Sequence, residues 1–212
     1  MRVSPADKGI ESLAFGHAIP ASWRLWLLRS PRMRNALGFC LFEIAFYFAY
    51  HYAMSFSRAC ASPFWFPDSV LLCALLLSRP RNWWLFVLGP LPIRLFSPIA
   101  QGLPYWFLLS TFMVDSAEGI VLAIALRRFL RNPARLETVQ EFVMFCFFAV
   151  LLVPTASAFG GAAARYGIGS DFWQAWKQWS MGDALAHLVV TPAILYWLIG
   201  SGPEMRMPSA KR

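Results

Sequence analysis

Six long apolar runs, separated by short basic segments, constrain this 212-residue chain more than any other feature. About 20 consecutive apolar residues are enough for a helix to span a bilayer. The second run is short for a full span, and Pro90 and Pro92 interrupt the third, which favours a tilted hairpin or a broken helix there. The pattern predicts an all-α polytopic membrane protein, a bundle of about six transmembrane helices with interfacial amphipathic segments. The runs cover residues 36–56, 64–78, 83–100, 104–126, 139–162 and 181–199.

The composition supports a membrane protein and argues against a nucleic-acid partner. Hydrophobic residues make up 58% of the chain and charged residues 14%, against about 25% charged in a soluble domain. The net charge of +8 is compatible with nucleic-acid binding in principle. The basic residues nevertheless cluster between the apolar runs, where they set topology and contact anionic lipid. We therefore expect the lipid bilayer, and no nucleic acid, as a partner.

The basic residues also predict the orientation. If the N-terminus is cytoplasmic, 15 of the 19 Lys and Arg residues fall in inner segments, three (Arg58, Arg165 and Lys177) fall in outer ones, and Arg94 lies within the third run. This asymmetry supports the six-span count and predicts a multi-pass membrane protein with both ends in the cytoplasm. The predicted organisation is a basic N-terminal segment with an interfacial helix, a six-helix membrane domain, and a short cytoplasmic tail. These parts cover residues 1–35, 36–199 and 200–212.

Two further patterns predict how segments lie in the membrane. Residues 22–34 have the character of an interfacial helix on the inner leaflet. Tryptophans recur every three residues after a Ser170/Asp171 helix cap, and we expect them to anchor the chain at the outer surface rather than to stack on a ligand. Small residues in the fifth run predict close helix packing. The tryptophans are Trp173, Trp176 and Trp179, and the small residues are Ala156, Ser157, Gly160 and Gly161.

Ionisable residues within the apolar runs are the candidate site, because such side chains are costly in a bilayer unless they face protein or water. His51, Asp68, Arg94, Asp183 and His187 fall at similar depth in the outer half, which predicts a polar cavity that opens outward. Two hypotheses stay open: the residues join helices, or they form a pocket for a small ligand or for protons. For Glu43 and His51 alone we favour the packing role. The candidate ligand-binding residues are Asp68, Arg94, Asp115, Glu118, Asp183 and His187.

Helical spacing gives more specific expectations for these side chains. Asp183, His187 and Thr191 recur every four residues and should share one helix face. Arg94 should approach a carboxylate, with Asp183 the first choice and Asp68 the second. Glu118 should face the bundle and pair with a polar group of another helix.

No catalytic or cofactor motif accompanies these residues. The sequence has no HExxH, P-loop or glycine-rich dinucleotide fingerprint, and no activated Ser or Cys nucleophile stands beside Asp183 and His187. The four cysteines have neither CxxC nor zinc spacing, so they predict no disulfide and no metal site. We expect neither catalysis nor a cofactor.

The last run and the segment before it contain W-x-x-W-x-x-G-D, followed by a proline at Pro192. Together with Trp65-Phe66-Pro67 and Asp115-x-x-Glu118, this resembles the bacterial membrane-associated sensor family MASE1 over residues 37–199. The chain departs from the family pattern at Ala186, where a glycine is usual and which His187 follows, and in the W-P-P motif, where one proline is replaced and Asp68 comes next. The resemblance implies a sensory membrane domain, with a cytoplasmic histidine kinase or diguanylate cyclase as the output partner.

The leading hypothesis is therefore a sensory or ligand-binding module that signals from the outward-facing cavity to a cytoplasmic partner. The alternative is a small transporter, or a transporter-associated subunit, that uses the same cavity. A structural scaffold is a third class, in which paired apolar replacements of the polar residues would be tolerated. The ligand and homo-oligomerisation stay open.

The orientation is directly testable. A reporter fused after Arg212 should be active only in the cytoplasm, and one inserted near Gly169 only outside, because the basic segments alternate in this sense. An external C-terminus would contradict both the six-span count and the depth assigned to the polar residues.

Overall fold

A computed structural model describes residues 31–56 and 64–200. The chain divides into two units, Met1–Gly38 and Phe39–Arg212, and the packing below concerns the second. The described part is helical throughout, as predicted. The interfacial helix expected at 22–34 lies mostly outside the described residues, whose first helix, α2, is Pro31–Phe56.

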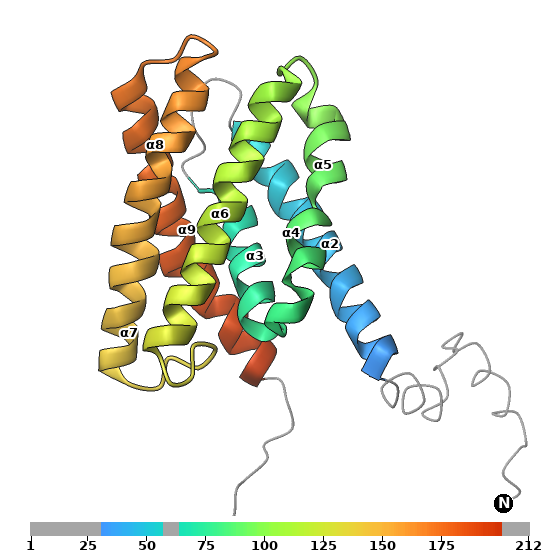
Figure 1. Ribbon diagram of the computed structural model, residues 1–212, viewed down its shortest axis with the longest axis vertical. Helices are drawn as coiled ribbons and strands as arrows, with labels where there is room; N and C mark the ends of the chain where they lie inside the picture. Colours follow the sequence, from blue (N-terminus) through green and yellow to red (C-terminus); the bar gives the residue numbers. More distant parts are fainter. Residues whose placement is uncertain (1–30, 57–63, 201–212) are drawn as a thin grey trace, which may run out of the picture. The chain divides into compact units, whose positions relative to one another are not determined.

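Four of the expected runs form helices long and apolar enough to cross a membrane. They are α2, α6 (Tyr105–Phe129), the continuous helix from α7 to α8, and α9 (Phe172–Gly200) (Figure 1). α7 (Val139–Phe145) passes into α8 (Val153–Tyr166) through a π-helical segment, Cys146–Leu152. Large apolar side chains such as Phe48, Met113 and Tyr196 are exposed on these helices. Such surfaces are expected to face lipid, which confirms the polytopic membrane bundle.

The second and third runs form shorter elements. α3 (Phe66–Leu77) has 12 residues and is therefore about 18 Å long, well short of the hydrocarbon thickness. The third run forms α4 (Trp83–Leu88) and α5 (Leu91–Phe96), which are interrupted at Gly89 and Pro90 as the prolines predicted. Two short 3-10 turns, Pro80–Asn82 and Pro98–Ala100, flank this pair.

The break between α4 and α5 is packed against α2. A Cβ atom on Gly89 would overlap the Oε1 atom of Glu43 and approach the ring of Phe39 to 2.9 Å. The Oε1 atom of Glu43 is buried and has no hydrogen-bond partner among the described residues. The glycine thus permits the close approach of the two segments, in agreement with the packing role expected for Glu43.

The small residues of α8 permit close approach on two sides, as predicted. A Cβ atom on Gly160 would lie 2.8 Å from Val114 of α6, and one on Gly161 would overlap the indole of Trp179 on α9. The Gly161 contact corrects the expectation that Trp179 anchors the chain at the membrane surface, because Trp179 is only 8% exposed. The sequence pattern missed this because the helix begins at Phe172, well before the expected start of the last span.

The start of α9 also follows from a local interaction. The Oδ1 atom of Asp171 accepts a hydrogen bond from the backbone N–H of Gln174 at 2.8 Å, so Asp171 caps the helix as expected. Trp173 is 60% exposed, in line with the anchoring role. Trp176 is half-buried and donates a hydrogen bond to the carbonyl oxygen of Thr155.

α3 lies between α6 and α9, and this placement positions the site. A Cβ atom on Gly119 of α6 would meet the side chain of Leu71 at 3.0 Å. Just before α3, the N–H of Trp65 donates to the carbonyl oxygen of Gly182 on α9 at 3.4 Å. The two contacts bring the polar residues of α3, α6 and α9 together.

The close approach of α8 and α9 makes position 161 sensitive to size. Replacing Gly161 by Ala should lower the free energy of unfolding by about 1–3 kcal/mol, because the added methyl group overlaps a rigid indole. The measurement is thermal unfolding in detergent. The exposed Ala163 of the same helix offers a control: Ala163→Leu adds more volume and should change the unfolding temperature little. Equal effects of the two changes would contradict the proposed packing.

Candidate functional site

Arg94, at the end of α5, is the most heavily partnered ionisable residue of the interior. Its Nη1 atom lies 2.7 Å from the Oδ2 atom of Asp115 on α6, and Nη2 donates to the hydroxyl of Thr111 at 2.8 Å. The rings of Tyr50 and Trp65 each lie 5.3 Å from the guanidinium carbon. Arg94 and Asp115 are 2% and 4% exposed. An ion pair buried to this extent holds its helices together mainly because neither charge can be left alone.

This pairing corrects the expectation that Arg94 would approach Asp183 or Asp68. The prediction compared residues by depth, and Asp115 was not among the residues assigned to the same depth as Arg94. The break at Gly89 and Pro90 ends the third run early, and the chain then returns directly into α6. α5 and α6 are therefore neighbours, and Arg94 pairs with Asp115 on the adjacent helix.

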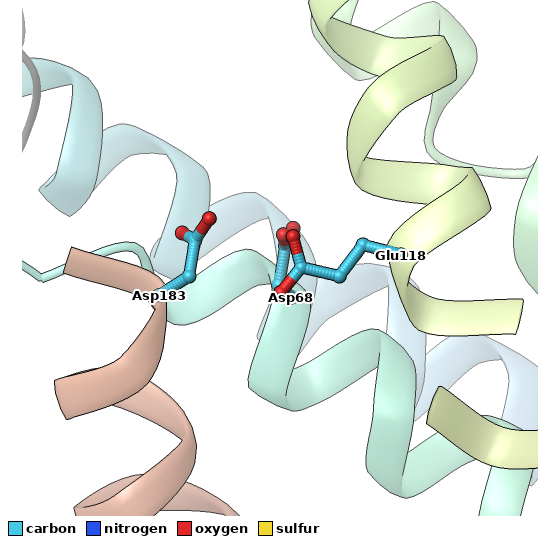
Figure 2. A group of neighbouring side chains, drawn as sticks. All are labelled: Asp68, Glu118 and Asp183. Atoms are coloured by element: carbon cyan, nitrogen blue, oxygen red, sulfur yellow. The ribbon is translucent and has the colours of Figure 1, made fainter. Parts of the chain in front are cut away.

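A second group of carboxylates lies beside this pair. Asp68 of α3, Glu118 of α6 and Asp183 of α9 each extend into the same space, as Figure 2 shows. One oxygen atom from each lies within 4.8 Å of the others. All three residues are at most 2% exposed. Three carboxylates at this spacing repel one another unless protons or a cation neutralise them.

Neighbouring donors orient two of these carboxylates. The indole N–H of Trp65 donates to the Oδ1 atom of Asp68 at 3.1 Å. The hydroxyl of Ser157 on α8 donates to the Oε2 atom of Glu118 at 2.5 Å. The expectation that Glu118 faces the bundle and pairs with a polar group of another helix is therefore confirmed. Ser157 was expected only as a small packing residue, and its position opposite Glu118 depends on the register of α8 against α6.

His187 completes this group from α9. Its Nε2 atom lies 3.4 Å from the Oε1 atom of Glu118, and its Nδ1 atom lies 3.5 Å from the hydroxyl of Ser69 and 3.3 Å from that of Thr191. Asp183, His187 and Thr191 are each at most 1% exposed, which confirms that they share one buried face of α9.

A cavity of about 30 Å³ adjoins Asp183. Its volume is enough for one or two water-sized groups, since a single water needs roughly 10–15 Å³ on this measure. The cavity lies where α8 ends and α6 and α9 begin. Of the predicted residues, Arg94 and Asp183 line it; the other lining residues are Tyr50, Met54, Trp65, Phe107, Leu108, Thr111, Arg165 and Trp179.

The sequence analysis missed Arg165, because it was counted as a charge of the outer loop. It is 8% exposed, and its guanidinium carbon lies 5.7 Å from the centre of the Phe107 ring. A signal was present: Arg165 follows Gly161 by four residues and so shares its inward face.

His51 does not belong to this group. Its Nε2 atom lies 2.8 Å from the hydroxyl of Ser97, within hydrogen-bond distance, and the residue is absent from the lining of the described cavity. The expected common cavity therefore loses His51, which agrees with the packing role that we favoured for it.

Comparison with known proteins gives one match. Residues 33–209 match the sequence model of the MASE1 family. No curated protein and no solved structure matches the chain. Since the match covers most of the sequence, the chain belongs to the MASE1 family, whose domain is a membrane-associated sensory domain.

The Arg94–Asp115 pair predicts strong energetic coupling. Asp115→Leu and Arg94→Leu should each destabilise the protein by about 3–5 kcal/mol, because each leaves a buried charge alone, and the double variant should recover much of the loss. Thermal unfolding of the four proteins in detergent measures the coupling. The exposed pair Arg135–Glu137, 3.6 Å apart, is the control and should couple by less than about 1 kcal/mol. Strictly additive effects at Arg94 and Asp115 would contradict the pair.

Proposed function

We propose that this member of the MASE1 family senses a small ligand or protons at its buried polar group and signals to a cytoplasmic partner. The observation that carries the proposal is the burial of six ionisable side chains on four elements. Asp68, Arg94, Asp115, Glu118, Asp183 and His187 are each at most 4% exposed, although a bilayer makes such groups costly. We further propose that the protein lies in the bacterial inner membrane with both ends in the cytoplasm.

The proposed transmission runs through α9. Asp183 lies in its first half and His187 near its middle, and the same helix continues without interruption to Gly200, despite Pro192. A change of charge at Asp183 or His187 alters the balance between the arrangements that this helix can take, and a rigid helix carries that shift to its far end. The partner in this proposal is a separate histidine kinase or diguanylate cyclase.

A transporter is the second candidate, and the interrupted pair α4–α5 favours it. Broken helices near charged residues line the substrate paths of many transporters. Here the break at Gly89 lies beside the buried Oε1 atom of Glu43, and Arg94 follows the break on α5. A proton path across the membrane would need ionisable groups in both the outer and the inner half of the bilayer. In this proposal, Arg94 is the outer group and Glu43 the inner one.

Hydrogen exchange tests the sensory proposal. In the full chain in lipid nanodiscs, freed of metal with a chelator, the protection factors of residues 192–200, which are corrected for the intrinsic pH dependence of amide exchange, should change between about pH 5 and pH 8, because protons act as the ligand or compete with it. Asp183→Asn should abolish that change. Asp171→Asn, which removes an exposed charge of the same helix, should retain it. Protection factors that are identical at both pH values in the unmodified protein would contradict the proposal.

The transporter alternative has its own measurement. Vesicles that contain the protein and a pH-sensitive dye should show no proton flux above that of empty vesicles if the chain is a sensor. Flux that Glu43→Gln abolishes would favour transport instead.

A further inference from the structure

The three buried carboxylates are not the ion-pair partners of Arg94. Its Nη1 atom lies 2.7 Å from the Oδ2 atom of Asp115, so Arg94 is committed to a fourth carboxylate. The contacts from Trp65 to Asp68 and from Ser157 to Glu118 come from neutral donors. The Oδ2 atoms of Asp68 and Asp183 are buried without a hydrogen-bond partner among the described residues. Neutral donors orient a carboxylate but leave its charge in place.

His187 supplies a second, independent observation. The imidazole is fully buried, and its Nδ1 atom is within reach of the Ser69 and Thr191 hydroxyls. Its Nε2 atom lies 3.4 Å from the Oε1 atom of Glu118, yet neither atom has a hydrogen-bond partner among the described residues. His187 therefore adjoins the group of three carboxylates through Glu118, and its Nε2 atom has no hydrogen bond that would prevent it from binding an ion between them.

The contacts of His187 match those of a metal ligand. A coordinating histidine binds through one ring nitrogen while the other nitrogen is held by a polar neighbour, which fixes the ring orientation. Here the hydroxyls of Ser69 and Thr191 take that place at Nδ1, and Nε2 stays available to an ion.

The spacing of the oxygens suits a single ion. Ligands on opposite sides of a divalent cation are about 4–5 Å apart, given metal–oxygen distances of about 2.0–2.6 Å. One carboxylate oxygen each of Asp68, Glu118 and Asp183 lies within 4.8 Å of the other two. Carboxylates combined with an imidazole suit Mn²⁺, Fe²⁺ or Zn²⁺ better than the purely oxygen-preferring Mg²⁺.

We propose that Asp68, Glu118, Asp183 and His187 form an intramembrane binding site for one divalent transition-metal cation. Because it names the ligand class of the sensory site, this inference rests on the proposed function. The cation neutralises two of the three carboxylate charges and joins α3, α6 and α9 at one point. The adjoining cavity, which Asp183 lines, has room for a water-sized group that completes the coordination of the ion.

Binding of Mn²⁺ to the full chain in lipid nanodiscs tests the site. After treatment with a chelator, the protein should bind about one Mn²⁺ per chain, and pulsed electron paramagnetic resonance should detect coupling to one imidazole nitrogen. Asp183→Asn should weaken binding by at least about 10–100-fold, which is the loss that follows when only a residue supporting a ligand is changed, and His187→Gln should remove the nitrogen signal. Zn²⁺ should compete for the same site, whereas the control Asp171→Asn should bind as the unmodified protein does.

Two outcomes overturn the site. If the unmodified protein binds no Mn²⁺ or Zn²⁺ stoichiometrically, the carboxylates are neutralised by protons and the metal site is wrong, whatever the variants do. If Asp183→Asn and His187→Gln are folded by circular dichroism and gel filtration but bind Mn²⁺ normally, the ion lies elsewhere. Because pH-dependent exchange in α9 is measured without metal, it can succeed while metal binding fails, and the two proposals are therefore separable.

Discussion

The buried ion pair between Arg94 and Asp115 is the interaction on which the arrangement of the polar interior depends. A buried guanidinium is stable only beside an opposite charge. The Nη1 atom of Arg94 lies 2.7 Å from the Oδ2 atom of Asp115, and this contact holds α5 against α6. With Arg94 held there, Tyr50 and Trp65 pack on the guanidinium, and Trp65 in turn reaches Asp68. Because Arg94 pairs with Asp115, its charge is not available to the neighbouring group of Asp68, Glu118 and Asp183.

Small residues on α8 allow this helix to pack closely against the polar interior. Gly160 and Gly161 let α8 approach both α6 and α9, and this approach brings Ser157 to Glu118 and Trp179 to the cavity. In a bilayer such contacts draw little from the hydrophobic effect and depend on close fit and hydrogen bonds. The same α8 surface therefore serves both packing and the polar group.

The sequence predicted the fold better than it predicted the partners within the site. Hydropathy identified the long helices, Pro90 and Pro92 marked the broken one, and the spacing of Asp183, His187 and Thr191 gave their common face, because each of these depends on local periodicity. The partner of Arg94 and the burial of Trp179 and Arg165 were missed. They depend on which helices become neighbours and where each one starts, and neither is encoded in the period of a single helix.

The close fit of Gly89 against Glu43 has a consequence for how this chain can change through evolution. A side chain at position 89 is incompatible with the present position of the Glu43 carboxylate. A shorter residue at 43 is compatible with Gly89, whereas a larger residue at 89 requires the carboxylate to move and also meets the backbone carbonyl oxygen of Leu85, 2.8 Å away. Evolutionary change is therefore easier at position 43 than at position 89, where the backbone of the broken helix that carries Arg94 favours glycine.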